Sequence, residues 1–189
     1  MELYYKIRYF FWLKKQMKQD KTIFLIGTPV HENIGDAAIA YAELKYLKNI
    51  LPKDNNIIEV DQNRMIKYLD VLKKVIRSDT RLILHGGGNM GDEWLKEEED
   101  RRKIIKTFAN NKMIIFPQTI HYQDPKKFLE SVEFYAKFKN LTIVAREKKS
   151  FEILKNNYKN EVILTPDIVL SLKDYNYTND TEKRKGCLL

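Results

Sequence analysis

Two glycine-rich segments carry most of the side chains that could bind or transform a substrate in this sequence. The first, GTPVHENIGDAA, begins at Gly27, and the second, HGGGNMGD, begins at His85. Four of the seven glycines in the chain fall within six consecutive positions of the second segment. Glycines let backbone N–H groups approach a ligand closely and adopt positive φ, so we expect this segment to cradle an anion or a hydroxyl-rich group.

The polar residues of these segments indicate acid–base chemistry on hydroxyl groups. Asp36 and Asp92 can orient or deprotonate a substrate hydroxyl, and each is also placed to cap the helix that we expect to begin there. These two are the candidate catalytic residues. The candidate substrate-binding residues are Gly27, His31, Asn33, Gly35, His85, Gly86, Gly87, Gly88, Asn89, Gln118, Thr119 and Arg146.

The elements that must position these residues follow from the alternation of short apolar runs with segments of helical period. The runs cover 22–26, 57–60, 81–84, 113–116, 141–144 and 162–164. This alternation predicts an α/β fold, a doubly wound Rossmann-like parallel sheet, over roughly residues 20–170. Because ligands bind outside the carboxyl ends of such strands, we expect the segments that begin at Gly27 and His85 to line one cleft.

Two helices can be anticipated from their apolar stripes and one from its first residues. One stripe is Ala40, Leu44, Leu47 and Leu51, and another is Met65, Leu69, Leu72 and Ile76. Asp124 followed by Pro125 is typical of a helix start, with a capping side chain and a proline in the first turn.

The first 20 residues read as an amphipathic helix rich in aromatic and basic side chains, and they lack the features of a signal peptide. Either this helix docks on the protein's own sheet, or it rests on an anionic membrane surface as a peripheral contact. Residues 173–189 read as a polar linker and the start of a second domain. The expected organisation is therefore 1–20, 21–172 and 173–189.

The net charge, the cysteine count and the spacing of the histidines limit the kinds of partner and the cellular compartment that we expect. The net charge of +8 favours anionic partners, but no nucleic-acid-binding motif is present, so we expect no nucleic acid. A single cysteine, Cys187, excludes an internal disulfide and fits a reducing cytoplasm. The three histidines do not have the spacing of a compact zinc motif, so we expect no metal.

Two familiar glycine motifs fit poorly. Gly86, Gly88 and Gly91 match the spacing of the dinucleotide fingerprint, but that motif follows the first strand and needs an acidic residue about 20 positions later, where Asn111 stands. The HGGG run is similar to the oxyanion-hole loop of esterases, yet no serine occupies a nucleophile elbow. A Walker A loop is absent from the sequence.

Taken together, GTPVHENIGDAAIA and LHGGGNMGDEW resemble the two N-x-G-D motifs of the polysaccharide pyruvyl transferase family. IVAREKKSFEIL (143–154) and TPDIVLSL (165–172) look like the next two landmarks, so the similarity runs from Lys21 to Leu172. The resemblance implies transfer of a pyruvyl group from phosphoenolpyruvate to two hydroxyls of a sugar, in a cell-surface polysaccharide or its lipid-linked precursor. It implies phosphoenolpyruvate as the donor substrate and no further cofactor.

The same resemblance implies a fold similar to a two-domain transferase of the GT-B type, of which this chain is the N-terminal, acceptor-side half. Asn33, Asn89 and Gln118 would then contact sugar hydroxyls, and Arg146 would oppose the charge of the donor phosphate. Two other functions remain open: a non-catalytic glycan-binding or scaffold module, and a related glycosyltransferase that uses a nucleotide sugar. The expected location is the cytoplasm, at the inner face of the membrane.

Overall fold

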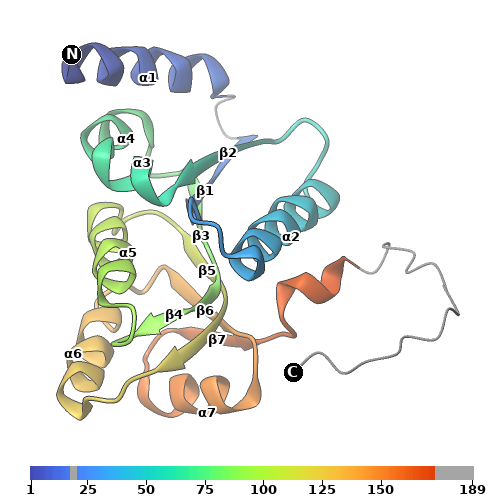
Figure 1. The fold of residues 1–189 in the computed structure, drawn as a ribbon, viewed down its shortest axis with the longest axis vertical. Coiled ribbons are helices and arrows are strands. Elements are labelled where there is room, and N and C mark those ends of the chain that lie inside the picture. Colours follow the sequence, from blue (N-terminus) through green and yellow to red (C-terminus); the bar gives the residue numbers. More distant parts are fainter. Residues whose placement is uncertain (18–20, 173–189) are drawn as a thin grey trace, which may run out of the picture.

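The computed structural model describes residues 1–17 and 21–172; the predicted linker and second-domain segment, 173–189, lies outside the described residues. A seven-stranded parallel sheet has the order β2-β1-β3-β5-β6-β7, with β4 paired to β5 (Figure 1). The strands are β1 (Thr22–Thr28), β2 (Asn56–Asp61), β3 (Arg81–Leu84), β4 (Gly87–Gly91), β5 (Met113–His121), β6 (Leu141–Ala145) and β7 (Glu161–Leu164). The helices are α1 (Glu2–Gln16), α2 (Ile34–Ile50), α3 (Gln62–Lys67), α4 (Leu69–Val75), α5 (Leu95–Thr107), α6 (Pro125–Tyr135), α7 (Lys148–Asn157) and the short 3-10 helix η2 (Ile168–Ser171).

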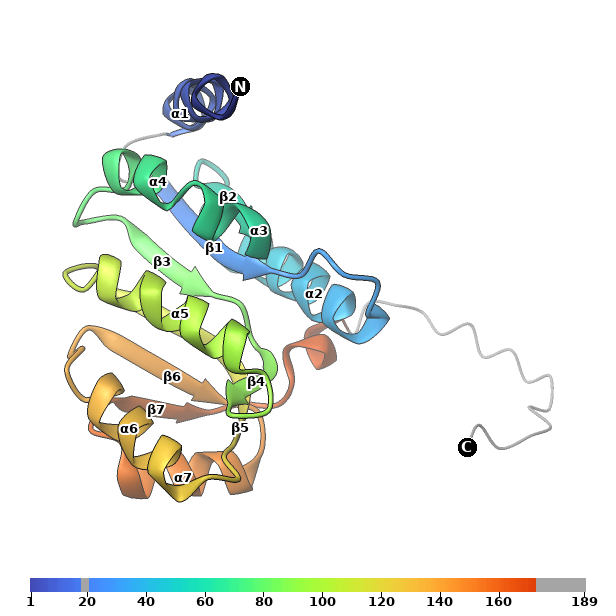
Figure 2. The ribbon, with the colours of Figure 1, turned by 60° about the vertical axis from the view of Figure 1, so that its left-hand side comes forward.

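Helices lie on both faces of this sheet, which confirms the predicted doubly wound α/β fold (Figures 1 and 2). Helices α3 to α7 share one large core with the strand residues that point toward them, such as Phe24 and Leu82. Helix α2 packs on the other face, where Leu47 joins Leu25 and Ile83 in a second core. Neighbouring strand residues enter different cores because side chains alternate between the faces of a strand.

All six runs predicted as strands are strands, but the segment after His85 holds one that sequence reasoning missed. The structure places a short strand, β4, where we expected a glycine loop leading into a helix, and β4 pairs with the far end of β5. Strand β5 accordingly continues past the predicted end at residue 116. It passes through Pro117 at a register shift between Ile115 and Gln118, a position that tolerates a residue without an N–H donor.

The start predicted for α6 is confirmed, whereas one predicted helix is divided into two. Asp124 caps α6 by accepting the Lys126 N–H at 2.8 Å, and Pro125 is the first helical residue, as predicted. The apolar stripe from Met65 to Ile76 is divided between α3 and α4, because Tyr68 interrupts the helix with φ −114° and ψ 25°.

Helix α1 packs mainly on α4, and its last turn also contacts the edge strand β2 of the sheet (Figure 1). Its Leu13 is fully buried, the Lys6 ammonium lies 3.2 Å from the Asp70 carboxylate, and Asn56 donates a hydrogen bond of 2.6 Å to the Gln16 carbonyl. Within residues 1–17 and 21–172, no helix has the length and apolarity needed to span a bilayer.

The face that carries α2 stays open over β5, β6 and β7. A groove of about 1290 Å³ runs across it, lined by Ile114, Val144 and Ile163 of the strands and by Leu170 of η2. Ile114 and Ile163 remain 39% and 42% exposed, so part of this sheet face lacks a helical cover among the described residues.

Candidate functional site

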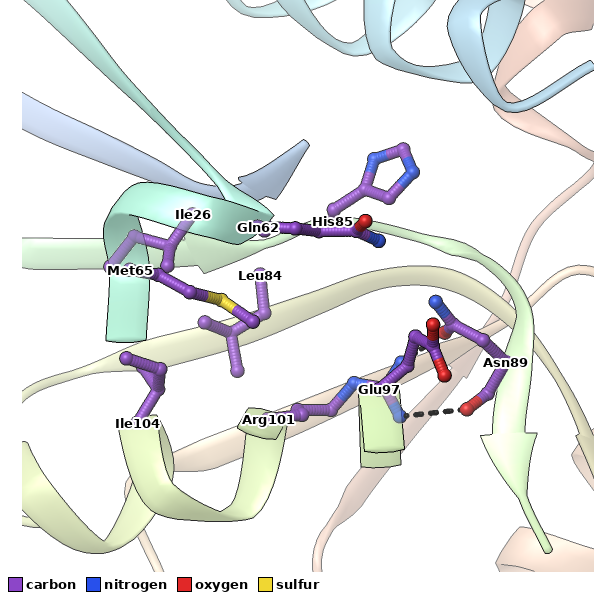
Figure 3. A pocket seen from close by; sticks show the side chains of 10 residues that line it. Ile26, Gln62, Met65, Leu84, His85, Asn89, Glu97, Arg101 and Ile104 are labelled. Atoms are coloured by element: carbon purple, nitrogen blue, oxygen red, sulfur yellow. Dashed lines mark hydrogen bonds between the residues drawn. The ribbon is translucent and has the colours of Figure 1, made fainter. Parts of the chain in front are cut away.

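A small cleft, with an accessible volume of about 20 Å³, lies at the carboxyl ends of β1 and β3, where the strand order reverses and where open α/β sheets bind their ligands. Its polar end holds the side chains of Asn89 and Arg101, with Glu97 beside them (Figure 3). Met65 and Ile104 lie at its apolar end. The lining residues are Ile26, Gly27, Gln62, Met65, Leu84, His85, Asn89, Glu97, Arg101 and Ile104.

Four glycines shape the junction between the two motif segments. Gly27 and Gly87 have φ of +93° and +121°, a region that L side chains rarely adopt. A Cβ on Gly86 would lie 2.7 Å from the Pro117 carbonyl oxygen, and one on Gly91 would lie 1.8 Å from the carbonyl oxygen of His121. The glycines of the second segment therefore serve close backbone packing against β5 as well as access to the cleft.

His85 is held in place by a carboxylate that sequence reasoning did not select. Glu43, on α2, is fully buried; its Oε2 lies 2.7 Å from His85 Nδ1, and its Oε1 accepts the Gly86 N–H at 2.7 Å. Gln118, which we expected to contact substrate, is also fully buried and donates to the His85 carbonyl at 2.9 Å. Gln118 thus positions the second segment, and it is too enclosed to reach a ligand in this arrangement.

In Figure 3 the imidazole of His85 points away from Met65 and Leu84, toward the face that carries α2. Only the backbone side of this residue therefore faces the cleft of Figure 3. Its Nε2 makes no hydrogen bond to the described part of the chain. A neutral His85 that donates through Nδ1 to Glu43 would leave Nε2 as an acceptor.

The first segment is organised by Asn33 and not by Asp36. Asn33 is the N-cap of α2, with its Oδ1 accepting the Gly35 N–H at 2.9 Å, which corrects the expectation that Asp36 caps this helix. Asp36 lies in the first turn, half-exposed, with Oδ2 3.5 Å from His31 Nε2. His31 Nδ1 accepts the Asn33 N–H at 3.4 Å, which leaves Nε2 as the ring nitrogen that faces Asp36.

Asp92 has a different role from Asp36. It caps no helix, because α5 begins at Leu95 after Trp94; instead its two oxygens accept the N–H groups of Gln123 and Asp124 at 2.8–3.0 Å. Desolvation opposes ionisation, but these two backbone hydrogen bonds outweigh it and lower the pKa of Asp92 below its usual value. Asp92 therefore ties β4 to the start of α6, and its lowered pKa makes it a weaker base than an ordinary carboxylate.

Asn89 is fixed by a buried cation. Its side-chain oxygen accepts a hydrogen bond from Arg101, whose guanidinium also contacts the Asn89 carbonyl at 3.4 Å (Figure 3). Arg101 pairs with Glu98 at 2.6 Å, and the same carboxylate accepts from Tyr135 at 3.0 Å. Glu98 and Arg101 are both buried, so this ion pair belongs to the core.

A third group of predicted residues gathers at the ends of β5 and β6. Arg146 donates from Nε to Thr119 Oγ1 at 2.7 Å and pairs with Asp167 at 3.0 Å. A Cβ on Gly88 would lie 3.3 Å from the remaining guanidinium nitrogen, so this glycine leaves room for the arginine.

The predicted site residues thus share one rim of the sheet but divide into three neighbouring groups. Gly27, His85 and Asn89 line the cleft; His31 and Asp36 lie beside Gly87, where a Cβ would be 4.0 Å from Asp36 Oδ1; and Thr119, Arg146 and Gly88 form the third group. Within residues 1–17 and 21–172, no group of three histidine, cysteine or acidic side chains could hold a metal ion.

Residues 33–186 match the family model described as polysaccharide pyruvyl transferase. The chain belongs to the polysaccharide pyruvyl transferase family. Both motif segments lie at the rim just described, and the match begins at Asn33, the N-cap of α2. The family resemblance drawn from the two glycine-rich segments is therefore confirmed.

Curated relatives of this pyruvyl transferase family chain come from bacteria and from yeast. General stress protein 30 of Bacillus subtilis is 38% identical over 160 residues, which make up 82% of this chain and 46% of that protein. Pyruvyl transferase 1 of Schizosaccharomyces pombe is 33% identical over 172 residues, 88% of this chain and 40% of that protein. The chain spans less than half the length of these two relatives.

Among solved structures, this pyruvyl transferase family chain is similar to an uncharacterised protein of Klebsiella pneumoniae. The TM-score is 0.51 at 22% sequence identity, and the match covers 90% of this chain and 58% of that chain. At that identity the likeness bears on the fold alone.

Proposed function

We propose that this chain is the acceptor-side half of an enzyme that transfers a pyruvyl group from phosphoenolpyruvate to a sugar. The acceptor is a cell-surface polysaccharide or its lipid-linked precursor, and the reaction takes place at the inner face of the membrane. Family membership supports the reaction class. The GT-B arrangement, in which a second domain brings the donor, is part of the proposal.

The observation that carries the proposal is the contact between the two motif segments at the rim. Asp36 is a half-exposed carboxylate beside the glycine strand, and its Oδ1 is close to Gly87 while its Oδ2 faces His31 Nε2. A carboxylate in this position can accept the proton of a sugar hydroxyl. Gly87 beside it bears no side chain that would cover the carboxylate.

The chemistry assigns different work to Asp36 and Asp92. In pyruvyl ketal formation, one sugar hydroxyl adds to C2 of the enol while a proton enters at C3; phosphate then leaves, and a second hydroxyl closes the ketal as it loses its proton. Each addition needs a base for a hydroxyl proton. Two backbone N–H groups lower the pKa of Asp92 and make it the weaker base, so we assign the base to Asp36.

The test supplies phosphoenolpyruvate and a lipid-linked oligosaccharide to the full two-domain enzyme of the proposal and measures release of inorganic phosphate together with pyruvylation of the glycan. The proposal expects both products in equal amounts, and expects Asp36→Asn to lower both about 100-fold. Consumption of a nucleotide sugar in place of phosphoenolpyruvate would show that the chain is part of a glycosyltransferase.

A glycan-binding module is the second candidate, and the polar side chains of His31 and Asp36, which are partly exposed at the rim, favour it for the chain taken alone. Calorimetric titration of residues 1–189 with the oligosaccharide tests binding without turnover. Affinity for glycan that Asp36→Asn and Asn89→Ala both weaken, with no phosphate released in any combination of substrates, would favour the module over the enzyme.

A further inference from the structure

The outer side of α1 exposes a row of large aromatic and apolar side chains. Phe11 is 65% exposed, Tyr4 58% and Trp12 45%. Globular proteins seldom present aromatic side chains so densely on one helix, and such patches mark interaction sites. The exposed set is Leu3, Tyr4, Tyr5, Ile7, Phe11 and Trp12, which we call the α1 outer face.

Basic residues accompany this face. Arg8, Lys14 and Lys15 are all exposed, and the Arg8 guanidinium lies 5.5 Å from the centre of the Tyr4 ring. The one acidic residue of α1, Glu2, is paired with Lys6 at 3.3 Å. The helix therefore presents aromatic groups and uncompensated positive charge together.

The opposite side of α1 is held firmly by the domain. Besides the burial of Leu13 and the Lys6–Asp70 pair, the Tyr9 ring lies 4.7 Å from the ring of Tyr68. Burial raises the pKa of the Tyr9 hydroxyl to about 12, as expected for a side chain enclosed between helices. One side of α1 thus packs on the domain while the other side stays exposed. The helix can therefore dock on the protein and contact a membrane surface at the same time.

We infer that the α1 outer face binds the surface of an anionic lipid bilayer, with the helix axis parallel to the membrane plane. Aromatic rings favour the headgroup level of a bilayer, where an apolar body and a polar edge are both accommodated. Arginine and lysine beside them are attracted by the negative potential of anionic lipids. A protein partner would need acidic side chains to meet the same charges, and it is the competing outcome of the tests below.

The position of α1 keeps the rim accessible in this arrangement. Helix α1 lies beside α4 at one end of the domain, whereas β4 and the glycine-rich rim lie toward the other end (Figures 1 and 2). A bilayer that contacts α1 therefore does not cover the cleft. The binding surface and the proposed acceptor site are separate, and either can exist without the other.

Flotation with vesicles tests the surface directly. The full 189-residue chain is mixed with vesicles of phosphatidylcholine containing phosphatidylglycerol, or of phosphatidylcholine alone, and centrifuged through a density gradient. We expect the chain to float with the anionic vesicles only. Lys14→Gln combined with Lys15→Gln should weaken binding about tenfold or more, since each cation near such a surface contributes about 1 kcal/mol.

Matched variants elsewhere on the domain control for charge and apolarity. Lys155→Gln with Lys159→Gln removes the same charge from the region of α7, and Leu129→Ser removes an apolar side chain that is 61% exposed on α6. Both should float as the unchanged chain does, while Phe11→Ser should bind at least about tenfold more weakly. Circular dichroism of each variant confirms that the helices are retained.

Tryptophan fluorescence reports which surface enters the headgroup region. The chain has two tryptophans, Trp12 and Trp94, so Trp94→Phe leaves Trp12 as the one indole emitter. We expect its emission to shift to shorter wavelength with anionic vesicles and to stay unchanged with phosphatidylcholine alone.

No flotation with anionic vesicles, or flotation that the α1 variants leave unchanged, would overturn the inference. Failure of pyruvyl transfer would leave it standing, because these measurements need no substrate.

Discussion

Glu43 Oε2 lies 2.7 Å from His85 Nδ1, and the second oxygen of the same carboxylate accepts the Gly86 N–H at 2.7 Å. One buried side chain of α2 therefore holds the beginning of the second glycine segment through both of its oxygens. Buried carboxylates are tolerated when they are paired and hydrogen-bonded in this way, and removal of one partner leaves the other groups unsatisfied.

We expect Glu43→Ala to destabilise the domain by about 3 kcal/mol, because it leaves the buried imidazole of His85 and the N–H of Gly86 without a hydrogen-bond partner. Urea unfolding followed by circular dichroism measures this. Glu59→Ala is the matched control, since Glu59 is exposed on β2 and its loss should change stability by less than about 0.5 kcal/mol. Equal effects of the two changes would contradict the role given to Glu43.

Asp36→Asn should leave the unfolding midpoint nearly unchanged and lower pyruvyl transfer by about 100-fold, because the amide cannot accept a hydroxyl proton. Steady-state phosphate release measures the loss. Asn33→Ala serves as the comparison: it removes the α2 cap and should cost about 1 kcal/mol of stability. A variant Asp36→Asn with full activity would remove this residue from the proposed mechanism.

Asp92→Ala should act on stability and in a pH-dependent manner. The folded-state pKa of Asp92 is lowered, so its stabilising contribution is present above the unfolded value of about 3.9 and is lost as pH falls through the folded pKa. We expect a loss of about 1 kcal/mol at neutral pH, comparable to the loss of a helix cap, and a smaller difference near pH 3. Urea unfolding at both pH values measures it; a difference that grows on acidification would reverse the sign argued here.

Gly91→Ala should be poorly tolerated, because the new Cβ would lie 1.8 Å from the His121 carbonyl oxygen and would force β4 away from β5. We expect a loss of about 2 kcal/mol or more, measured by thermal unfolding. Gly35→Ala is the control: its Cβ would meet the Asn33 side chain at 3.2 Å, and alanine favours the helix that begins there. A similar melting temperature for both variants would show that β4 yields easily.

The strands could be predicted because their signal is local. Runs such as 141–144 are β-branched and apolar, and such runs become buried parallel strands in most contexts. Strand β4 gave no such signal: it is GGNMG, and it is a strand only because β5 lies beside it with open hydrogen-bonding groups. The cap of α2 was misplaced for a related reason, since both Asn33 and Asp36 are good capping residues and the loop through His31 decides between them.

The buried charges were missed because a charged residue on a helix usually faces water. One signal for Glu43 was present in the sequence: it stands three residues after Ala40 and four before Leu47, on the apolar stripe of α2. Glu98 and Arg101 offered no comparable sign, since their burial depends on Tyr135 and Asn89 from distant parts of the chain. The periodicity of apolar residues cannot predict contacts between residues that are far apart in the sequence.

Helix α2 joins the two motif segments mechanically. Asn33 caps its first turn at the end of the loop after β1. Glu43 lies ten residues, or about 15 Å, farther along the axis and accepts the backbone N–H of Gly86 after β3. A helix of this length behaves as a stiff rod. Because one helix makes both contacts, it fixes the spacing between the loop after β1 and the backbone at His85, and the two halves of the motif share one support.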